Sequence, residues 1–130
     1  MHRKLLQAKL HRVRVTDVQL DYEGSLAVDQ RLLDAADIRE YEQLHIYNVN
    51  NGERFTTYAV SAASDSGSIA VLGAAARRVA KNDLLIICTY ADFDEQEAAV
   101  HQPRRVYVDD QNQITGIDDG AGAAPKRLVV

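Results

Sequence analysis

Short β-rich segments separated by turn residues make up most of the chain. Residues 10–20 alternate loosely between apolar and polar side chains and are rich in valine, as a half-buried strand is. The longest apolar run, from Leu84 to Cys88, predicts a buried strand over residues 84–90. The same reasoning predicts further strands over residues 42–49, 53–60, 69–72 and 105–108.

Turn residues separate these segments at intervals of roughly 8 to 12 residues. Asn50-Asn51-Gly52 joins two strand segments, and Asn-Gly is the strongest short-range hairpin signal. Residues 64–68 and 81–83 form further turn clusters. A short helix capped by Asp29 is expected up to Ala36, and a helical turn is expected over residues 73–78. This pattern predicts a mainly β fold, either a barrel or a sandwich.

The composition fits one domain. The chain has 130 residues, 46% hydrophobic and 26% charged, which is typical of a globular protein. No apolar run approaches the roughly 20 residues needed to cross a bilayer. Its one cysteine, Cys88, falls within an apolar run, so a core position and a reducing compartment are expected. From Asp118 the composition shifts to Gly, Ala and Pro, which predicts a domain over 1–117 and a flexible tail over 118–130.

The net charge of −4 argues against nucleic acid as a partner. The distribution is uneven, because five basic residues precede the first acid, Asp17. A basic, acid-poor N-terminus is one mark of a transit peptide. Here it lacks the usual serines and continues into the alternating stretch, so it is interpreted as part of the fold. With no signal peptide recognised, a cytoplasmic location is expected.

Several common kinds of functional site have no sequence signature here. The chain contains no CxxC, HExxH, GxGxxG or P-loop motif, and its four histidines lack metal-ligand spacing. The acidic run over residues 92–97 is interpreted as a solvated face. Neither a metal nor a nucleotide site is therefore expected.

The stretch Tyr22-Glu23-Gly24-Ser25 gains meaning only from its surroundings, because a Gly-Ser pair alone usually marks a turn. Four blocks occur in the order and at the positions found in bacterial aspartate 1-decarboxylases, and over about residues 1–117 the chain resembles that family. The blocks are Lys9-Leu10-His11-Arg12, Tyr22-Glu23-Gly24-Ser25, Asn48 to Tyr58, and Gly73-Ala74-Ala75-Ala76.

The resemblance implies a double-psi β-barrel with short helices, usually assembled as a homotetramer whose active sites lie between subunits. It also implies a proenzyme that cuts itself between Gly24 and Ser25 into chains 1–24 and 25–130. The Ser25 hydroxyl must attack the Gly24 carbonyl, and a strained glycine held against the hydroxyl favours this step. Ser25 would then become a pyruvoyl cofactor, which forms a Schiff base with the substrate and accepts electrons as CO2 leaves.

Further roles carry over from the family residue by residue. Thr57 matches a threonine whose hydroxyl supports the Gly24 carbonyl during cleavage, and Tyr58 matches the proton donor to the product. Without the resemblance, Thr57 would be interpreted as a simple strand threonine. One geometric question stays open, because Arg54, Thr56 and Tyr58 share a strand face and Thr57 faces the other way. Thr57 and Tyr58 serve one site only if the strand twists or bulges, or if the site wraps around its edge.

Recognition of a substrate with two carboxylates requires positive charge. Arg54 can hold one carboxylate in bidentate fashion, and Lys9 supplies a second cation. His11 is either a further carboxylate contact or a structural residue. Backbone N–H groups at the start of the helical turn suit an anion as well. These groups belong to Gly73, Ala74 and Ala75.

One residue departs from the family pattern, since Leu72 stands where an asparagine is common, close to the cleavage site. The change removes a hydrogen-bonding group and adds apolar bulk. Cleavage tolerates it, or the pocket prefers another substrate, or cleavage is slow or needs a helper protein for maturation.

The expected activity is decarboxylation of L-aspartate to β-alanine and CO2 for pantothenate and coenzyme A synthesis. Two alternatives remain. The first is a pyruvoyl decarboxylase of another acidic amino acid, and the second is a non-enzymatic barrel that serves as a binding module.

Overall fold

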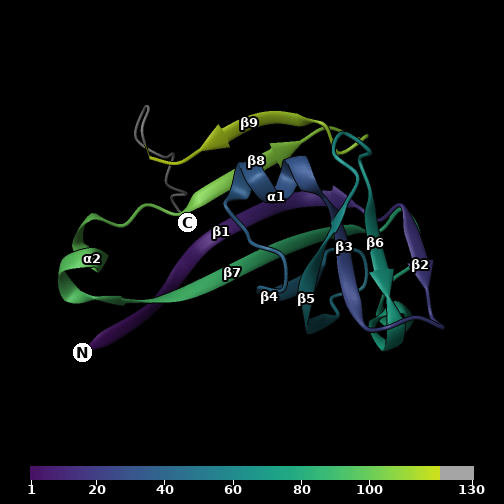
Figure 1. Cartoon of the computed structure of the whole chain (residues 1–130), viewed down its shortest axis with the longest axis horizontal. Helices are drawn as coiled ribbons and strands as arrows, with labels where there is room; N and C mark the ends of the chain where they lie inside the picture. The colour runs from purple at the N-terminus through teal and green to yellow at the C-terminus, as the bar shows by residue number, and fades with distance from the viewer. Residues whose placement is uncertain (121–130) are drawn as a thin grey trace.

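A computed structural model describes residues 1–120 of the chain (Figure 1). Among these residues a single mixed sheet contains nine strands, joined by two short α-helices and one 3₁₀ helix. The mainly β prediction is therefore confirmed. In chain order the elements are β1 (His2–Arg14), β2 (Asp17–Gln19), β3 (Ser25–Asp29), α1 (Gln30–Ala36), β4 (Gln43–Asn48), β5 (Arg54–Ala62), β6 (Ile69–Leu72), η1 (Gly73–Arg78), β7 (Leu84–Asp94), α2 (Glu95–Val100), β8 (Arg104–Val108) and β9 (Ile114–Asp118).

The sheet closes into a barrel because the continuous segment that forms β1 and β2 occurs at two separate places in the strand order. The order runs β2-β6-β3-β5-β4-β7-β1-β8-β9, and β2 directly continues the chain of β1. At their junction the Thr16 N–H donates to the Ile69 carbonyl at 2.8 Å, which joins this segment to β6. Parallel pairs, β3 with β5 and β2 with β6, lie among antiparallel ones. This is the double-psi β-barrel that the resemblance implies.

The inward faces of the barrel strands form one apolar core. Side chains alternate in direction along each strand, so every second residue points inward. Apart from Leu10 and Val13, which are separated by a β-bulge, the fully buried strand residues follow this alternation. They are almost all aliphatic, so burial of apolar area stabilises the closed barrel. They include Leu10, Val13, Leu26, Val28, Leu44, Ile46, Ile69, Val71, Leu85 and Ile87.

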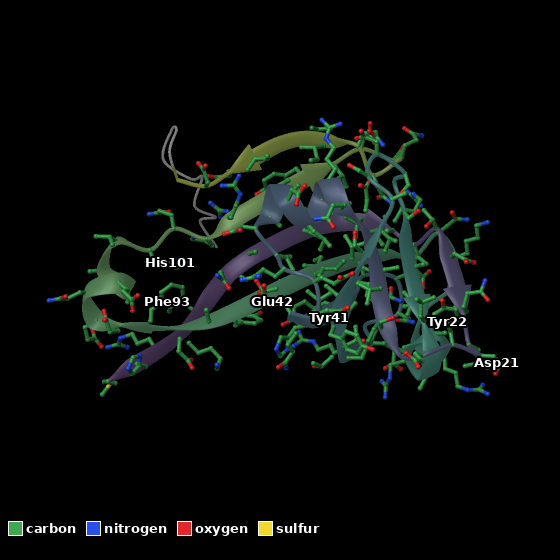
Figure 2. All side chains as sticks on the ribbon, in the orientation of Figure 1. Asp21, Tyr22, Tyr41, Glu42, Phe93 and His101 are labelled. Atoms are coloured by element: carbon green, nitrogen blue, oxygen red, sulfur yellow. The ribbon has the colours of Figure 1, made fainter. Side chains whose placement is uncertain are left out.

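Outside the barrel, β1 and β7 continue as a long two-stranded ribbon that ends at α2 (Figure 1). Asp94 and Glu97 form a capping box at the start of α2, so part of the acidic run stabilises a helix end. Figure 2 shows Phe93 and His101 beside this helix, and their ring centroids lie 4.2 Å apart.

Most of the expected elements are confirmed, including the Asp29 cap of α1 and the strands on both sides of Asn50-Asn51-Gly52. Cys88 is buried as expected. The basic N-terminus belongs to the fold, because β1 begins at His2. The sequence pattern missed β3, β9 and α2. Part of the expected tail, Asp118, ends β9, and residues 121–130 lie outside the described residues.

Candidate active site

Ser25 begins β3 and lies between two neighbouring strands. Its backbone pairs with Leu72 of β6, and Leu26 pairs in parallel with Ala59 of β5. Leu26 faces the core, so Ser25 points to the outer face of the barrel, yet only 4% of its surface is exposed. Its hydroxyl donates to the Glu23 carbonyl at 3.4 Å. A buried hydroxyl with one long hydrogen bond is available for chemistry at the adjacent peptide.

Gly73, the first residue of η1, packs directly against the segment before Ser25. Its φ is +80°, and a Cβ placed there would lie 2.6 Å from the Cα of Gly24 and 3.0 Å from the carbonyl oxygen of Tyr22. No larger residue fits without moving this segment. Gly24 itself differs, since a Cβ there would meet nothing within 4 Å. The steric need for glycine expected at Gly24 therefore lies at Gly73, on the opposite side of the contact.

Strand β5 runs past the Gly24–Ser25 peptide without a bulge. Its register with β4 is unbroken from Arg54 to Tyr58, and exposure alternates regularly along it. Arg54 and Tyr58 therefore face outward, and Thr57 faces inward. Extending the parallel register of β3 and β5 places Ser25 beside Tyr58 and Gly24 beside Thr57. The unbroken register leaves no bulge over these residues, so one site can use both Thr57 and Tyr58 only if it reaches both faces of β5.

Arg54 lies on the same outer face as Tyr58, four residues away, or about 13 Å along a strand. Its guanidinium carbon stands 4.9 Å from the centroid of the Tyr47 ring. The Tyr47 hydroxyl is hydrogen-bonded to the Tyr90 hydroxyl at 2.9 Å. Arg54 is exposed, so its free N–H groups can reach an anionic ligand.

Lys9 and His11 lie on β1, away from Ser25. Counting along the sheet, β1 is four strand positions from β3, each step about 4.8 Å. Lys9 pairs with Cys88 of β7 and is half-buried. A single chain therefore brings together Gly24, Ser25, Thr57, Tyr58 and Gly73, but it does not bring Lys9 or His11 to them.

His11 occupies a cavity of about 320 Å³ that Arg12, Arg14 and Tyr107 also line. Its ring meets the Tyr107 ring edge-on at 5.7 Å, and its buried Nδ1 has no hydrogen-bond partner in the described chain. Burial, followed by the nearby charges of Lys9 and Arg12, lowers the pKa of His11 from its ordinary value. The imidazole is therefore neutral at pH 7 and offers a carboxylate a hydrogen bond rather than a charge.

Ala74 and Ala75 follow Gly73 in η1, which packs against β2, β5 and β6. The residue before the helix, Leu72, makes no side-chain capping bond. The first N–H groups of such a turn have no partner within it, so they suit an anion. Within residues 1–120, no group of three or more His, Cys, Asp or Glu side chains could hold a metal ion.

Sequence reasoning missed the partners of Arg54. Tyr47 and Tyr90 are 43 residues apart, so nothing in the local pattern joins them. The only available signal was strand alternation, which puts Tyr47 on the outer face of β4 beside Arg54 once the hairpin register is known.

Comparison with known proteins shows which family the chain is similar to. A model of the family described as aspartate decarboxylase matches residues 1–115. Proteins named aspartate 1-decarboxylase from Methylococcus capsulatus and Methylobacillus flagellatus are each 60% identical, over 88% of this chain and 91% and 90% of their own lengths. One from Laribacter hongkongensis is 58% identical over 92% of this chain and 94% of its own. A solved structure of a computationally designed protein, msDPBB_sym2, covers 65% of this chain and 96% of its own, with a TM-score of 0.41 and 17% identity.

Proposed function

This chain belongs to the aspartate decarboxylase family, and we propose that it decarboxylates L-aspartate to β-alanine and CO2 after cutting its own chain between Gly24 and Ser25. One observation carries the proposal beyond family membership. The Gly24–Ser25 peptide is held between Gly73 on one side and the Thr57–Tyr58 edge of β5 on the other. An ordinary surface turn would need neither the close contact with Gly73 nor a buried serine hydroxyl.

The cleavage step needs only groups already present. The Ser25 oxygen attacks the Gly24 carbonyl carbon, the C–N bond breaks, and an ester replaces the amide. Thr57, beside Gly24, is the proposed donor to the oxyanion that forms, a contribution of about 3 kcal/mol for such donors. Loss of the Ser25 α-proton and cleavage of its Cβ–O bond then release Gly24 as a carboxylate and leave dehydroalanine at position 25. Addition of water and loss of ammonia leave a pyruvoyl group at position 25.

The residues around Ser25 fit a pyruvoyl group. The group is smaller than a serine with its peptide link, and Ser25 is already buried beside Tyr58 and Leu72. A pyruvoyl group at position 25 would supply a ketone for the substrate amine and an electron sink for the bond to the departing carboxylate. The chain's own residues must then bind the substrate and supply a proton.

Arg54 is the proposed ligand of one substrate carboxylate, because its guanidinium is exposed and already oriented by Tyr47. Lys9 supplies a second positive charge, and the N–H groups of Gly73 to Ala75 offer uncharged donors near Ser25. Tyr58, beside Ser25 and 37% exposed, is the proposed proton donor to the product. His11 is the proposed neutral contact.

Lys9 and His11 are proposed to join this set from another subunit. They lie four strand positions from Ser25 when counted through β5, β4 and β7. The outer face of β1 that carries these half-buried residues would meet the Ser25 region of a neighbouring copy if subunits pack side by side. We therefore propose a homotetramer with each active site between two subunits.

The proposed setting is the bacterial cytoplasm, where β-alanine enters pantothenate and coenzyme A synthesis. The one cysteine, Cys88, is free and buried, as suits a reducing compartment. No helix in the described part of the chain is long and apolar enough to span a membrane.

Intact-mass measurement tests the proposal most directly. The purified protein should contain fragments 1–24 and 25–130, the larger one lighter than a serine-ended fragment by the mass of one ammonia. Ser25→Ala should stay whole and inactive, and the matched control Ser64→Ala, in an exposed turn, should behave as wild type. A wild-type chain that stays whole after long warming, alone and in host-cell extract, contradicts the proposal.

One observation favours a second candidate substrate. Leu72 pairs directly with Ser25, so an apolar side chain stands beside the position of the proposed pyruvoyl group. CO2 release from glutamate equal to that from aspartate would favour a decarboxylase of another acidic amino acid. A non-enzymatic binding module would instead release CO2 from neither and be unaffected by Ser25→Ala. A maturation helper would show itself as cleavage that occurs only in host-cell extract.

A further inference from the structure

Arg54, Tyr47 and Tyr90 form a continuous stack on the outer face of β5, β4 and β7. The Arg54 guanidinium lies over the Tyr47 ring at 4.9 Å, and the two tyrosine hydroxyls are 2.9 Å apart. His45 meets the Tyr90 ring edge-on at 5.1 Å. The stack therefore connects an exposed cation on one strand to half-buried groups two strands away.

Such a stack restricts a side chain that is otherwise free to rotate. An exposed arginine loses roughly 2 kcal/mol of rotamer entropy when a ligand fixes it. An aromatic ring beneath the guanidinium attracts the cation by about 0.5–1 kcal/mol and leaves its N–H edge open. The ring serves this purpose only if it is itself fixed. The hydrogen bond to Tyr90 fixes the far end of Tyr47, and the contact with His45 fixes Tyr90.

The hydrogen bond between the tyrosines persists across the neutral pH range. The bond to Tyr47, followed by burial, raises the pKa of Tyr90 well above its usual range. The Tyr90 phenol therefore keeps its proton throughout the neutral pH range. An aromatic residue without a hydroxyl at position 47 would keep the ring contact and lose this anchor.

We propose that Tyr47 and Tyr90 are a positioning pair that holds the Arg54 guanidinium ready for a substrate carboxylate. The inference rests on the proposed function only in taking Arg54 as the carboxylate ligand. Neither tyrosine touches the reacting atoms in this proposal. Loss of the pair therefore weakens substrate binding and leaves the chemical step and the self-cleavage unchanged.

The test uses four variants of the full chain: Tyr47→Phe, Tyr90→Phe, the double variant, and Tyr41→Phe as a matched control. Each single change at positions 47 and 90 removes one hydroxyl and keeps the ring. Tyr41 is 73% exposed and lies outside the stack. Two readouts are measured, the KM and kcat for aspartate, and the Kd for succinate, a dicarboxylate that binds without reacting.

The expected result is a rise in KM and in the succinate Kd of roughly three- to tenfold for Tyr47→Phe and for Tyr90→Phe. The double variant should lose no more than either single one, because both remove the same bond. Tyr41→Phe should match wild type, and kcat should change less than about twofold in every variant.

Other outcomes overturn the proposal. Additive losses mean that the tyrosines act separately. A lower melting temperature with unchanged KM and Kd means that the pair is merely structural. Failure of succinate to bind the wild type removes the carboxylate site itself. If wild type binds succinate but releases no CO2 from aspartate, the proposed function fails, and the Kd values alone still decide the positioning role.

Discussion

Gly73→Ala should damage both stability and self-cleavage, and Gly52→Ala separates its two effects. Both glycines have a positive φ, +80° at Gly73 and +75° at Gly52. A Cβ at Gly52 would meet nothing within 4 Å, whereas a Cβ at Gly73 would lie 2.6 Å from the Cα of Gly24. The control therefore carries the backbone strain without the clash.

The magnitudes follow from these two terms. A non-glycine residue in the left-handed region costs about 1–2 kcal/mol. Overpacking against fixed backbone adds typically 1–3 kcal/mol. Gly52→Ala should thus lower the free energy of unfolding by about 1–2 kcal/mol, and Gly73→Ala by about 2–5 kcal/mol. Urea unfolding of both variants in a Ser25→Ala background measures this without interference from cleavage.

Cleavage should respond to Gly73→Ala alone. Normal contact requires the Gly24 segment to move by about 1 Å, and a misplacement of that size can cost about 100-fold in rate. A time course of intact mass, with Ser25 restored, follows the reaction. The reasoning is refuted if Gly73→Ala unfolds at the same urea concentration as Gly52→Ala and cleaves at the wild-type rate.

Three further predictions concern the site. Leu72→Asn should speed self-cleavage, because an amide side chain then stands in register with Ser25. A time course of intact mass that does not differ from wild type argues against this prediction. Inactive Lys9→Ala and Ser25→Ala chains that are refolded together should regain part of the activity. Some sites then receive an intact Lys9 from one subunit and an intact Ser25 from the other. No recovery of activity would show that each site lies within one subunit. Burial, with the nearby positive charges, lowers the pKa of His11 in the folded chain. The unfolded chain therefore binds a proton at this residue more readily, and the free energy of unfolding should fall as the pH drops below about 6.5. His11→Gln should remove that component of the pH dependence, measured by urea unfolding at pH 7.5 and 5.5.

Local signals accounted for the elements that the sequence predicted correctly. The hairpin at Asn50-Asn51-Gly52 and the Asp29 cap depend on neighbouring residues, and both lie where expected. Strand β3 was missed because it begins at the serine of a Gly-Ser turn signal and has too few residues to show alternation. Its position is set by parallel pairing with β5 and antiparallel pairing with β6, contacts that no local pattern records.

The same nonlocal pairing resolves the apparent conflict between Thr57 and Tyr58. Considered alone, adjacent strand residues point to opposite faces and cannot serve one point in space. Ser25 begins the strand that pairs in parallel with β5, and Gly24 lies in the bend just before it. Extending the printed register by one residue puts Ser25 on the outer face with Tyr58 and brings the Gly24 backbone next to Thr57. In the proposed mechanism, alternation separates the two tasks, since Thr57 would support the Gly24 carbonyl from the inner side of β5 and Tyr58 would donate its proton on the outer side.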